Sequence, residues 1–381
     1  MSHEPFVPAV HAVQSTPLRV ALLGCGTVGS AVARRLAGSD ALRGVHLTTI
    51  CDRRAGVKRS TLRLPDAVRW TTSIDAVLES DADVVVEAIG GVDPAAAWIR
   101  RALLSGKSVV TANKQVIASE GHALLGLAAR QGRQLRFEAA VGGAMPIVRA
   151  ISDGLCGDRL THITAILNGT TNAVLSTMER TGCSLSAALA DARARGYAEA
   201  DPSLDLDGGD AAAKLAILCG LAFGVRVDAS SIATRTASAI TPVDLDEARG
   251  EGNTIRQIAH ATYEIANGTL TARVAPVAVP ISSVFGGTHG ANNAAVITGR
   301  YSGDTTIAGA GAGGDATAVA IVSDLAAIAR DRAAIVPAPV WTRPSRVVGF
   351  DHPERSFDRL ERASELVAAG LQTGSFLSEA V

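Results

Sequence analysis

Leu18-Arg-Val-Ala-Leu-Leu23 leads directly into Gly24-Cys-Gly-Thr-Val-Gly29, and a helical pattern follows from Val28 to Leu36. The aliphatic run predicts a buried strand, so the glycine-rich turn stands between a strand and a helix. In this setting the glycines permit a tight turn and let a pyrophosphate approach the backbone N–H groups at the helix N-terminus. The combination predicts a dinucleotide-binding unit, which an isolated GxGxxG would support only weakly.

Strands and helices continue to alternate beyond this unit. We expect helices from about Pro94 and over Val116–Arg130, and further strands at Val45–Cys51, Asp83–Ala88, Val109–Thr111 and Leu135–Ala140. Such alternation predicts an α/β fold with a Rossmann-type, doubly wound parallel sheet, whose ligands lie at the carboxyl ends of the strands. Asn113 and Lys114 occupy such an end, although Lys114 also fits a surface lysine that follows a strand.

The second strand ends at Asp52, and two arginines follow it. An acid at this position suits the adenosine ribose hydroxyls and favours NAD. Arg53 and Arg54 would instead suit the 2′-phosphate of NADP, or they are ordinary surface charges. The sequence leaves the choice between NAD and NADP open.

The segment from Arg195 to Leu218 combines an acidic loop with an apolar helix. Asp210 suits the helix N-terminus because its carboxylate can accept backbone N–H groups, and Lys214 shares its face four residues on. The loop before this helix carries four carboxylates: Glu199, Asp201, Asp205 and Asp207. One interpretation is a capped helix with one salt bridge and a solvated acidic loop. The other is a pocket in which one lysine transfers a proton and the acids hold a polar, cationic substrate.

Composition excludes several classes of partner. The 381 residues have a net charge of −1 and no Lys/Arg run, which argues against a nucleic-acid or anionic-membrane surface. No apolar run approaches the length of a membrane span. The five cysteines are scattered, odd in number and without a CxxC, which predicts reduced thiols rather than disulfides or a zinc site. We therefore expect a soluble cytoplasmic protein with room for two domains.

Four motifs later in the chain are more specific. They are Glu138-Ala-Ala-Val-Gly-Gly-Ala-Met-Pro146, Ile166-Leu-Asn-Gly-Thr-Thr-Asn172, Gly196-Tyr-Ala-Glu-Ala-Asp-Pro202 and Asp205-Leu-Asp-Gly-Gly-Asp-Ala-Ala-Ala-Lys214. With these motifs, in this order and spacing, the chain resembles the homoserine dehydrogenases over about residues 18–330. The match loosens over Ser282–Asn293, where the family pattern is shorter.

The resemblance implies reversible hydride transfer between NAD or NADP and a small amino-acid substrate. The reaction would interconvert L-aspartate 4-semialdehyde and L-homoserine in threonine and methionine biosynthesis. A positioned ammonium fits this chemistry because reduction of the aldehyde builds negative charge on its oxygen. The atypical segment leaves a second interpretation open, a related dehydrogenase of another small amino or hydroxy acid. A non-catalytic cofactor-binding protein is a third, and the intact acidic and lysine residues argue against it.

The resemblance also implies roles for individual residues. Lys214 would donate and accept the proton, and Lys114 would lie between nicotinamide and substrate. The substrate would be bound by Glu199, Asp205 and Asp210. The cofactor would contact Gly24, Gly26, Thr27, Val28, Gly29, Asp52, Arg53, Lys114, Gly196 and Gly311. A monovalent cation, usually sodium, would be held by Glu138 and by backbone oxygens of Val141, Gly143 and Met145, and such a hard cation prefers oxygen ligands.

The implied organisation starts with a disordered tail (1–17) and a dinucleotide-binding domain (18–146). An α+β domain (147–310) would bind the substrate and pair two subunits through its sheet, which predicts a homodimer. Within this second domain we expect a helix at Ile255–Ala266 and a strand at Arg273–Val279.

A glycine-rich turn then leads into residues 311–330, which would return as a helix to the first domain. A flexible linker is the alternative for that turn. Residues 331–381 form an extension without an assigned role, with a helix expected at Ser356–Ala369. This extension looks too short for the regulatory amino-acid-binding module of many family members, so we expect a short form without feedback regulation through such a module.

Overall fold

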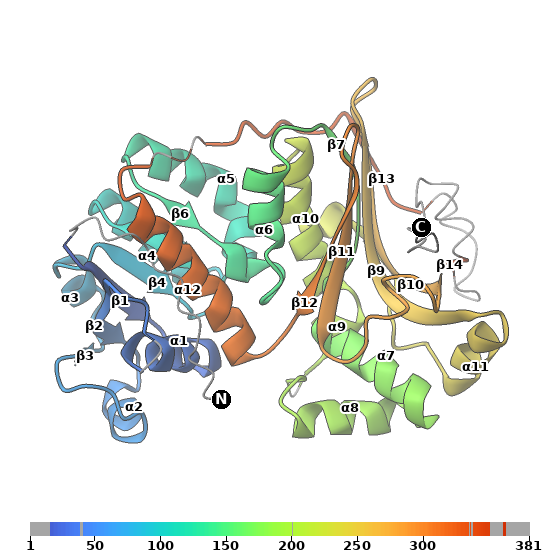
Figure 1. The fold of residues 1–381 in the computed structure, drawn as a ribbon, viewed down its shortest axis with the longest axis horizontal. Helices are drawn as coiled ribbons and strands as arrows, with labels where there is room; N and C mark the ends of the chain where they lie inside the picture. The colour runs from blue at the N-terminus through green and yellow to red at the C-terminus, as the bar shows by residue number, and fades with distance from the viewer. Residues whose placement is uncertain are drawn as a thin grey trace, which may run out of the picture.

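Two β-sheets covered by helices lie side by side in the computed structural model (Figure 1). Helices α5 (Lys114–Arg130) and α10 (Gly209–Phe223) pack against each other between them. The structure describes residues 16–38, 41–199, 201–334, 336 and 338–350, and the backbone of 361–362. Apart from its last two residues, the expected N-terminal tail lies outside these ranges. So does the expected helix Ser356–Ala369, except at Glu361–Arg362, which form the short strand β14.

The first sheet is parallel, with the strand order β3-β2-β1-β4-β5-β6. Its strands are β1 (Leu18–Leu23), β2 (Val45–Cys51), β3 (Arg69–Thr71), β4 (Val84–Glu87), β5 (Ser108–Thr111) and β6 (Leu135–Arg136). The strand order reverses between β1 and β4, which is where dinucleotides bind in doubly wound sheets. The expected Rossmann-type sheet is confirmed.

Helices cover both faces of this sheet because its strands are apolar on both sides. Val20 and Leu22 of β1 belong to the core beneath α1 (Thr27–Ala37) and α12 (Gly314–Arg330). Ala21 and Leu23 point to the other face. That face is covered by α3 (Ile74–Leu78), α4 (Ala95–Leu104) and α5, while the short α2 (Ala55–Thr61) follows β2. Burial on both faces therefore places β1 in the interior of the sheet.

The last strand of the first sheet is shorter than expected. The sequence predicted a strand over Leu135–Ala140, but β6 ends at Arg136 and a 3₁₀ turn, η1, covers Glu138–Ala140. Polar bonds turn the chain here: the Glu138 N–H donates to the Asp324 carboxylate at 2.9 Å. The chain then passes through α6 (Ile147–Arg149) and a π-helical turn, η2 (Ala150–Gly154), into the second sheet.

The second sheet has the order β12-β11-β7-β9-β10-β13, and its neighbours are antiparallel from β12 to β10. Its strands are β7 (Leu160–Ile166), β8 (Ala233–Thr234), β9 (Asn253–Glu264), β10 (Thr269–Pro280), β11 (Asn292–Gly299), β12 (Gly303–Ala310) and β13 (Arg346–Val348). The helical elements are α7 (Gly169–Thr181), α8 (Leu185–Ala194), α9 (Ser203–Leu206), α10, η3 (Ala229–Ser231) and α11 (Pro242–Gly250). Helices α7 and α10 pack directly on the strands (Figure 1).

The expected helix at Ile255–Ala266 is wrong, because these residues form most of strand β9. Ile255, Ile258 and Ala259 have the i, i+3, i+4 spacing of a helix, which misled the prediction. In the fold Ala259 packs in the core shared with α10, and Ile258 packs with Phe285 in a different cluster. Pairing with β7 and β10 on both sides overrides the local helical pattern. The strand expected at Arg273–Val279 is confirmed within β10.

A buried ion pair ties α7 to β9. The Arg256 side chain is fully buried, and its guanidinium lies 2.9 Å from the Glu179 carboxylate. The same guanidinium donates to the carbonyls of Gly286 and Thr288, each at 3.3 Å. Arg256 therefore fixes the loop between β10 and β11, which is the segment where the family pattern loosens.

We expect Arg256→Met to lower the free energy of unfolding by about 3–5 kcal/mol, because Glu179 then loses its guanidinium partner. Asp246→Asn is the matched control, since it breaks an exposed pair with Arg249 at 3.0 Å. That change should cost less than about 1 kcal/mol. Urea denaturation of both variants measures the difference, and equal losses would contradict a structural role for the buried pair.

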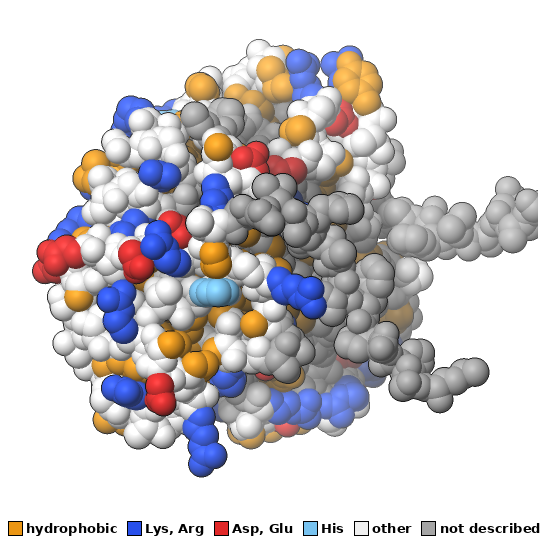
Figure 2. All heavy atoms as spheres, turned by 60° about the vertical axis from the view of Figure 1, so that its left-hand side comes forward, with side chains coloured by type: hydrophobic (Ala, Val, Ile, Leu, Met, Phe, Trp, Pro, Cys, Tyr) orange, Lys and Arg blue, Asp and Glu red, His pale blue; other side chains and the backbone are white. Residues whose placement is uncertain are grey.

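The surface seen in Figure 2 carries a mixture of charges. Lys and Arg side chains are interspersed with Asp and Glu, and hydrophobic side chains show in small separate groups. This distribution agrees with the near-zero net charge of the chain. None of the helices in the described ranges combines the length and hydrophobicity that crossing a bilayer requires.

Candidate active site

Three charged side chains meet where α5 and α10 begin. Asp210 lies in the first turn of α10, as expected, and Lys214 follows one turn later on the same face. Lys214 Nζ lies 2.8 Å from Asp210 Oδ2, and Lys114 Nζ, at the start of α5, lies 2.9 Å from Asp210 Oδ1. The side chain of Asp210 is 8 % exposed, that of Lys214 13 % and that of Lys114 36 %. One buried carboxylate thus holds two ammonium groups, and Lys114 faces the more open side.

Electrostatics keep this cluster charged. Burial would raise the pKa of Asp210, but the ammonium groups of Lys214 and Lys114 outweigh it and hold that pKa well below its usual range. Burial would likewise lower the pKa of Lys114, yet the negative charges of Asp210, Asp205 and Glu199 raise it. Asp210 is therefore a carboxylate and Lys114 an ammonium at neutral pH.

Lys214 has a second anchor in the backbone of the second sheet. Its ammonium donates to the Leu167 carbonyl at 2.8 Å, in addition to its bond with Asp210. An ammonium carries three hydrogens, so these two bonds among the described residues leave one for another oxygen. The group is held in place and still able to donate a proton.

The acidic loop divides into two parts in the structure. Asp205, in α9, lies beside the cluster, and burial raises its pKa. Glu199 is exposed, but its charge acts on Lys114. Asp201 instead accepts from the Ser203 hydroxyl at 2.5 Å, and Asp207 accepts from Thr236 at 2.7 Å. The structure therefore groups Asp205 and Glu199 with the two lysines and not Asp201 or Asp207.

Asn168 is a member of this cluster that sequence reasoning missed. Its amide nitrogen donates to Asp205 Oδ1 at 2.7 Å and to Asp210 Oδ2 at 2.8 Å. The available signal was its place in the Ile166–Asn172 motif, directly before a Gly-Thr-Thr helix start. An asparagine there predicts a helix cap, which it is, but a cap alone does not point to contact with two carboxylates.

The glycine-rich turn fits a dinucleotide on its geometry. Gly24 has a φ of +87°, and a Cβ on Gly29 would lie 2.0 Å from the Gly24 carbonyl oxygen. Gly26 is the N-cap of α1, and no side chain caps this helix, whose first turn contains Thr27 and Val28. A Cβ on Gly26 would meet no atom within 4 Å. Backbone N–H groups at the start of α1 are therefore open to an anionic ligand, as a pyrophosphate requires.

Asp52 supports this turn directly. Its carboxylate accepts from the backbone N–H of Cys25 at 2.7 Å and of Arg54 at 2.8 Å. Burial would raise the pKa of Asp52, but these two bonds and the charges of Lys58 and Arg54 lower it. Arg53 and Arg54 are exposed at the end of β2. Asp52 therefore binds the glycine-rich turn through the Cys25 N–H and lies near the positive charges of Lys58 and Arg54.

The second glycine-rich segment approaches the first. A Cβ on Gly311 would lie 2.2 Å from the Asn293 side chain, so a larger residue does not fit there. A Cβ on Gly314, at the start of α12, would lie 2.9 Å from the Thr27 carbonyl oxygen. The turn before α12 is thus packed against the start of α1 rather than acting as a free linker. Gly196 is exposed in the loop after α8.

The loop where the family pattern loosens is well anchored. Besides its bonds with Arg256, it is held by the Asn172 side-chain amide, which donates to the Thr288 carbonyl at 3.1 Å and to the Gly290 carbonyl at 3.0 Å. A Cβ on Gly169 would lie 2.8 Å from the Ala291 carbonyl oxygen. The loop therefore packs against the start of α7, which carries Asn168.

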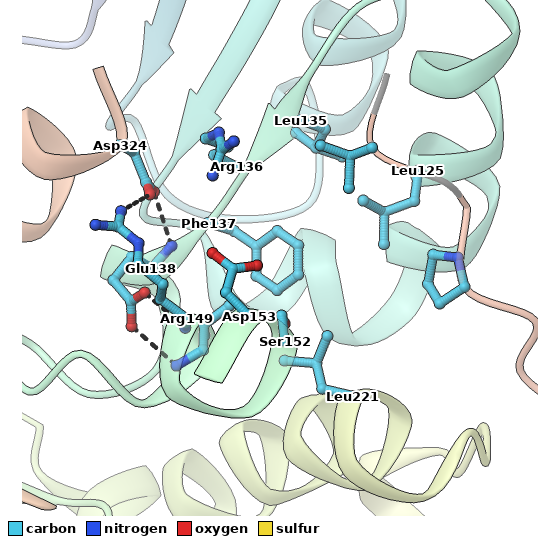
Figure 3. Close-up of a pocket in the computed structure, with 13 residues that line it drawn as sticks. Leu125, Leu135, Arg136, Phe137, Glu138, Arg149, Ser152, Asp153, Leu221 and Asp324 are labelled. Atoms are coloured by element: carbon cyan, nitrogen blue, oxygen red, sulfur yellow. Dashed lines mark hydrogen bonds and ion pairs between the residues drawn. The ribbon is translucent and has the colours of Figure 1, made fainter. Parts of the chain in front are cut away.

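The residues expected to hold a cation form a tight turn. The Glu138 carboxylate accepts from the backbone N–H groups of Val148 and Arg149, each at 2.9 Å (Figure 3). Burial and the neighbouring Asp324 raise the pKa of Glu138 to about 7. In the described part of the chain, no N–H donates to the carbonyls of Val141 or Gly143. Two of the expected backbone oxygens are thus without an N–H partner among the described residues, whereas the Met145 carbonyl accepts the Ile147 N–H at 2.8 Å and the Glu138 carboxylate caps the next helix.

A pocket of about 350 Å³ lies beside this turn, among α5, α10 and α12. Figure 3 shows Leu125, Phe137 and Leu221 on one side of it and Arg149 with Asp324 on the other. Arg149 and Asp324 already pair at 3.0 Å. The most buried charges of this pocket are therefore satisfied within the protein, and we assign no ligand to it.

Two family models match the chain. A model described as the NAD-binding domain of homoserine dehydrogenase matches residues 24–138, and a model described as homoserine dehydrogenase matches residues 146–326. The homoserine dehydrogenase of Mycobacterium tuberculosis is 40 % identical over 323 residues, which cover 83 % of this chain and 73 % of that protein. The enzyme of Corynebacterium glutamicum is 37 % identical over 328 residues, covering 82 % and 72 %.

Solved structures give the same result. A homoserine dehydrogenase from Thiobacillus denitrificans superposes with a TM-score of 0.79 at 33 % identity, covering 87 % of this chain and 80 % of that one. A hyperthermophilic archaeal homoserine dehydrogenase in complex with NADPH has a TM-score of 0.67 at 26 % identity, covering 81 % and 97 %.

Proposed function

Because this chain belongs to the homoserine dehydrogenase family, we propose that the cluster of Lys214, Asp210 and Lys114 carries its reaction. The activity is the NAD(P)-dependent interconversion of L-aspartate 4-semialdehyde and L-homoserine. The single observation that carries the assignment of the site is Lys214, a nearly buried ammonium with two fixed acceptors among the described residues and a third hydrogen left for a substrate oxygen.

In this mechanism Lys214 moves the proton. The nicotinamide cofactor supplies or accepts the hydride. As the aldehyde is reduced, negative charge develops on its oxygen, and the ammonium of Lys214 stabilises that charge and donates the proton. In the reverse direction the same nitrogen accepts the hydroxyl proton. Asp210 and the Leu167 carbonyl keep Nζ in one position, so little reorganisation is needed.

The acids suit the rest of the substrate. Homoserine carries an α-ammonium group, and the negative charges of Glu199, Asp205 and Asp210 all act at Lys114, the more exposed of the two lysines. Lys114 adds a positive charge for the substrate carboxylate or the developing alkoxide. Turnover of a panel of small amino-alcohols and hydroxy acids tests this assignment. A preference for L-homoserine supports it, whereas equal turnover of a substrate without an ammonium group would contradict it.

We propose that NADP is the preferred cofactor. Both oxygens of Asp52 already accept backbone N–H groups, and the positive charges of Lys58 and Arg54 act on this carboxylate. Exposed guanidinium groups suit the negatively charged 2′-phosphate of NADP. A carboxylate without hydrogen-bond partners would repel that phosphate.

The double variant Arg53→Gln and Arg54→Gln should lower kcat/KM for NADP by about 10–100-fold, since a charge-assisted bond to phosphate contributes about 1.5–3 kcal/mol. The kcat/KM for NAD should change little. Arg59→Gln, at an exposed arginine in the following helix α2, is the matched control. Equal losses of kcat/KM with both cofactors would show that the two arginines do not bind the 2′-phosphate.

A monovalent cation held by Glu138 and by backbone oxygens of Val141, Gly143 and Met145 is a further proposal. Among the described residues, no group of three or more His, Cys, Asp or Glu side chains could hold a metal ion. A cation at this turn would therefore depend on carbonyl oxygens. Replacing sodium by choline should lower the thermal midpoint. In Gly143→Ala the response should be lost, because the new Cβ would lie 2.6 Å from the Ala310 carbonyl oxygen. Identical midpoints in both salts for the unmodified chain would reject the site.

Two further proposals concern assembly and location. We expect a homodimer through the second sheet, and sedimentation equilibrium should give twice the chain mass of 38.9 kDa. A mass of one chain at micromolar concentration would contradict it. A cytoplasmic location fits the five free cysteines, three of which are buried.

A further inference from the structure

Asn168 connects three elements of the active site through one side chain. It is the N-cap of α7, and its Oδ1 accepts the Thr171 N–H at 2.7 Å. Its Nδ2 uses both of its hydrogens, one to Asp205 in α9 and one to Asp210 in α10. The residue is 4 % exposed, so water does not replace these bonds.

Leu167 and Asn168, which are adjacent in the chain, contact Lys214 and its partner Asp210. The Leu167 carbonyl accepts from Lys214 Nζ at 2.8 Å. The other acceptor, Asp210 Oδ2, is the oxygen to which Asn168 donates. If the Asp210 carboxylate rotated, its Oδ2 would move away from Lys214 Nζ. The Asn168 amide opposes that rotation because it donates to the same oxygen. The Thr171 hydroxyl also holds the Asp205 backbone carbonyl at 2.9 Å.

Neighbouring carboxylates in a buried site oppose each other's charge. The groups that face Asp205 are Asp210 and Lys214 from α10 and Lys114 from α5, with Glu199 acting on Lys114 from the preceding loop. Burial and Asp210 raise the pKa of Asp205, and the Asn168 amide is the first of the groups that lower it. The amide therefore favours the state in which both acids are charged.

We propose that Asn168 is a positioning residue that keeps the carboxylates of Asp205 and Asp210 side by side and charged, and thereby fixes Lys214 and the ammonium-binding side of the site. This inference rests on the proposed function of the cluster. Asn168 itself does not touch the reacting atoms. Its effect is transmitted through the two acids.

The test is the pH profile of kcat/KM for L-homoserine in Asn168→Ser. Serine keeps an N-cap oxygen but lacks the two amide hydrogens, so α7 should remain capped. We expect the acid limb of the profile to move up by about one pH unit, because Asp205 then takes up a proton more readily. KM should rise more than kcat falls, and the loss should shrink at higher pH.

Asn168→Asp is the second variant, and it covers the case in which the serine variant does not fold. Aspartate has nearly the same shape and can cap α7, but it places a third carboxylate beside Asp205 and Asp210. The acid limb should move further than in the serine variant. Ser184→Ala is the matched control, since Ser184 caps α8 without touching a carboxylate and should leave the profile unchanged.

A uniform loss of kcat/KM at every pH, with the acid limb in place, would overturn the proposal and leave Asn168 as a helix cap only. An unchanged profile would overturn it as well. The proposed function fails separately, through absence of homoserine turnover in the unmodified chain. The two failures are therefore distinguishable in one set of measurements.

Discussion

Lys214→Ala is expected to lower kcat for homoserine oxidation by about 10²–10⁴-fold, the range that general acid–base catalysis supplies. Lys214 is the more buried of the two lysines that bind Asp210, and it keeps one hydrogen for a substrate oxygen. KM for the cofactor should change little, because Lys214 lies on α10 and not in the glycine-rich turn.

The matched control for this variant is Lys107→Ala. Lys107 is also buried and donates to two backbone carbonyls, those of Ser80 and Ala82, but it lies directly before β5, away from the cluster. Its loss should lower stability and leave kcat near the value of the unmodified chain. A normal kcat in Lys214→Ala would remove Lys214 from the proton-transfer step.

Asp210→Asn should lower kcat/KM by about 10²–10⁴-fold. The neutral amide no longer holds the ammonium groups of Lys214 and Lys114, so Lys214 is misplaced for a proton transfer that contributes about 10²–10⁴-fold. Without Asp210, Lys214 keeps the Leu167 carbonyl as its partner and loses its direction toward the substrate. Asp207→Asn is the control, because Asp207 is exposed and bonds to Thr236 outside the cluster.

The Asp210 prediction has a second readout in acid stability. The folded pKa of Asp210 lies below its ordinary value of 3.8, so its contribution to stability is complete above about that pH and is lost as the pH falls below it. Asp210→Asn should be less stable than the unmodified chain at neutral pH, and the difference should shrink in acid. A difference that stays constant down to the acid transition would contradict the charged state assigned to Asp210.

The nucleotide-binding half was predictable because its signals are local. The Leu18–Leu23 run, the glycine turn and the following helix lie next to one another in the chain, and glycine at Gly29 follows from the close Gly24 carbonyl. The prediction extended the strand at Leu135–Ala140 well beyond its observed end at Arg136. There the chain turns at a hydrogen bond from the Glu138 N–H to Asp324 in α12. No residue near Leu135–Ala140 in the sequence predicts this distant partner.

The second sheet was harder to predict because its pairing is not local. Strand β9 has helical spacing at Ile255, Ile258 and Ala259, and only its pairing with β7 and β10 makes it a strand. Neither neighbour can be identified from residues 253–264 alone. The strand over β10 was predicted correctly because Arg273–Val279 is rich in β-branched valine.

The contacts of the candidate site also divide into local ones, which the sequence predicts, and long-range ones, which it does not. The pairing of Asp210 with Lys214 follows from four-residue spacing on one helix. The bond from Lys114 to Asp210 depends on packing of α5 against α10, which spacing does not reveal. Asn168 was missed because a neutral amide before a helix is fully explained as a cap, and its two carboxylate partners come from distant α9 and α10.

The central claim is that Lys214 serves the chemical step and not binding. Single-turnover measurement of reduced nicotinamide, with enzyme in excess over the oxidised cofactor and L-homoserine saturating, tests it most directly, because it separates hydride transfer from substrate binding and product release. We predict that Lys214→Ala binds both ligands as the unmodified chain does and transfers hydride about 10²–10⁴-fold more slowly. Hydride transfer at the unmodified rate in this variant would contradict the account.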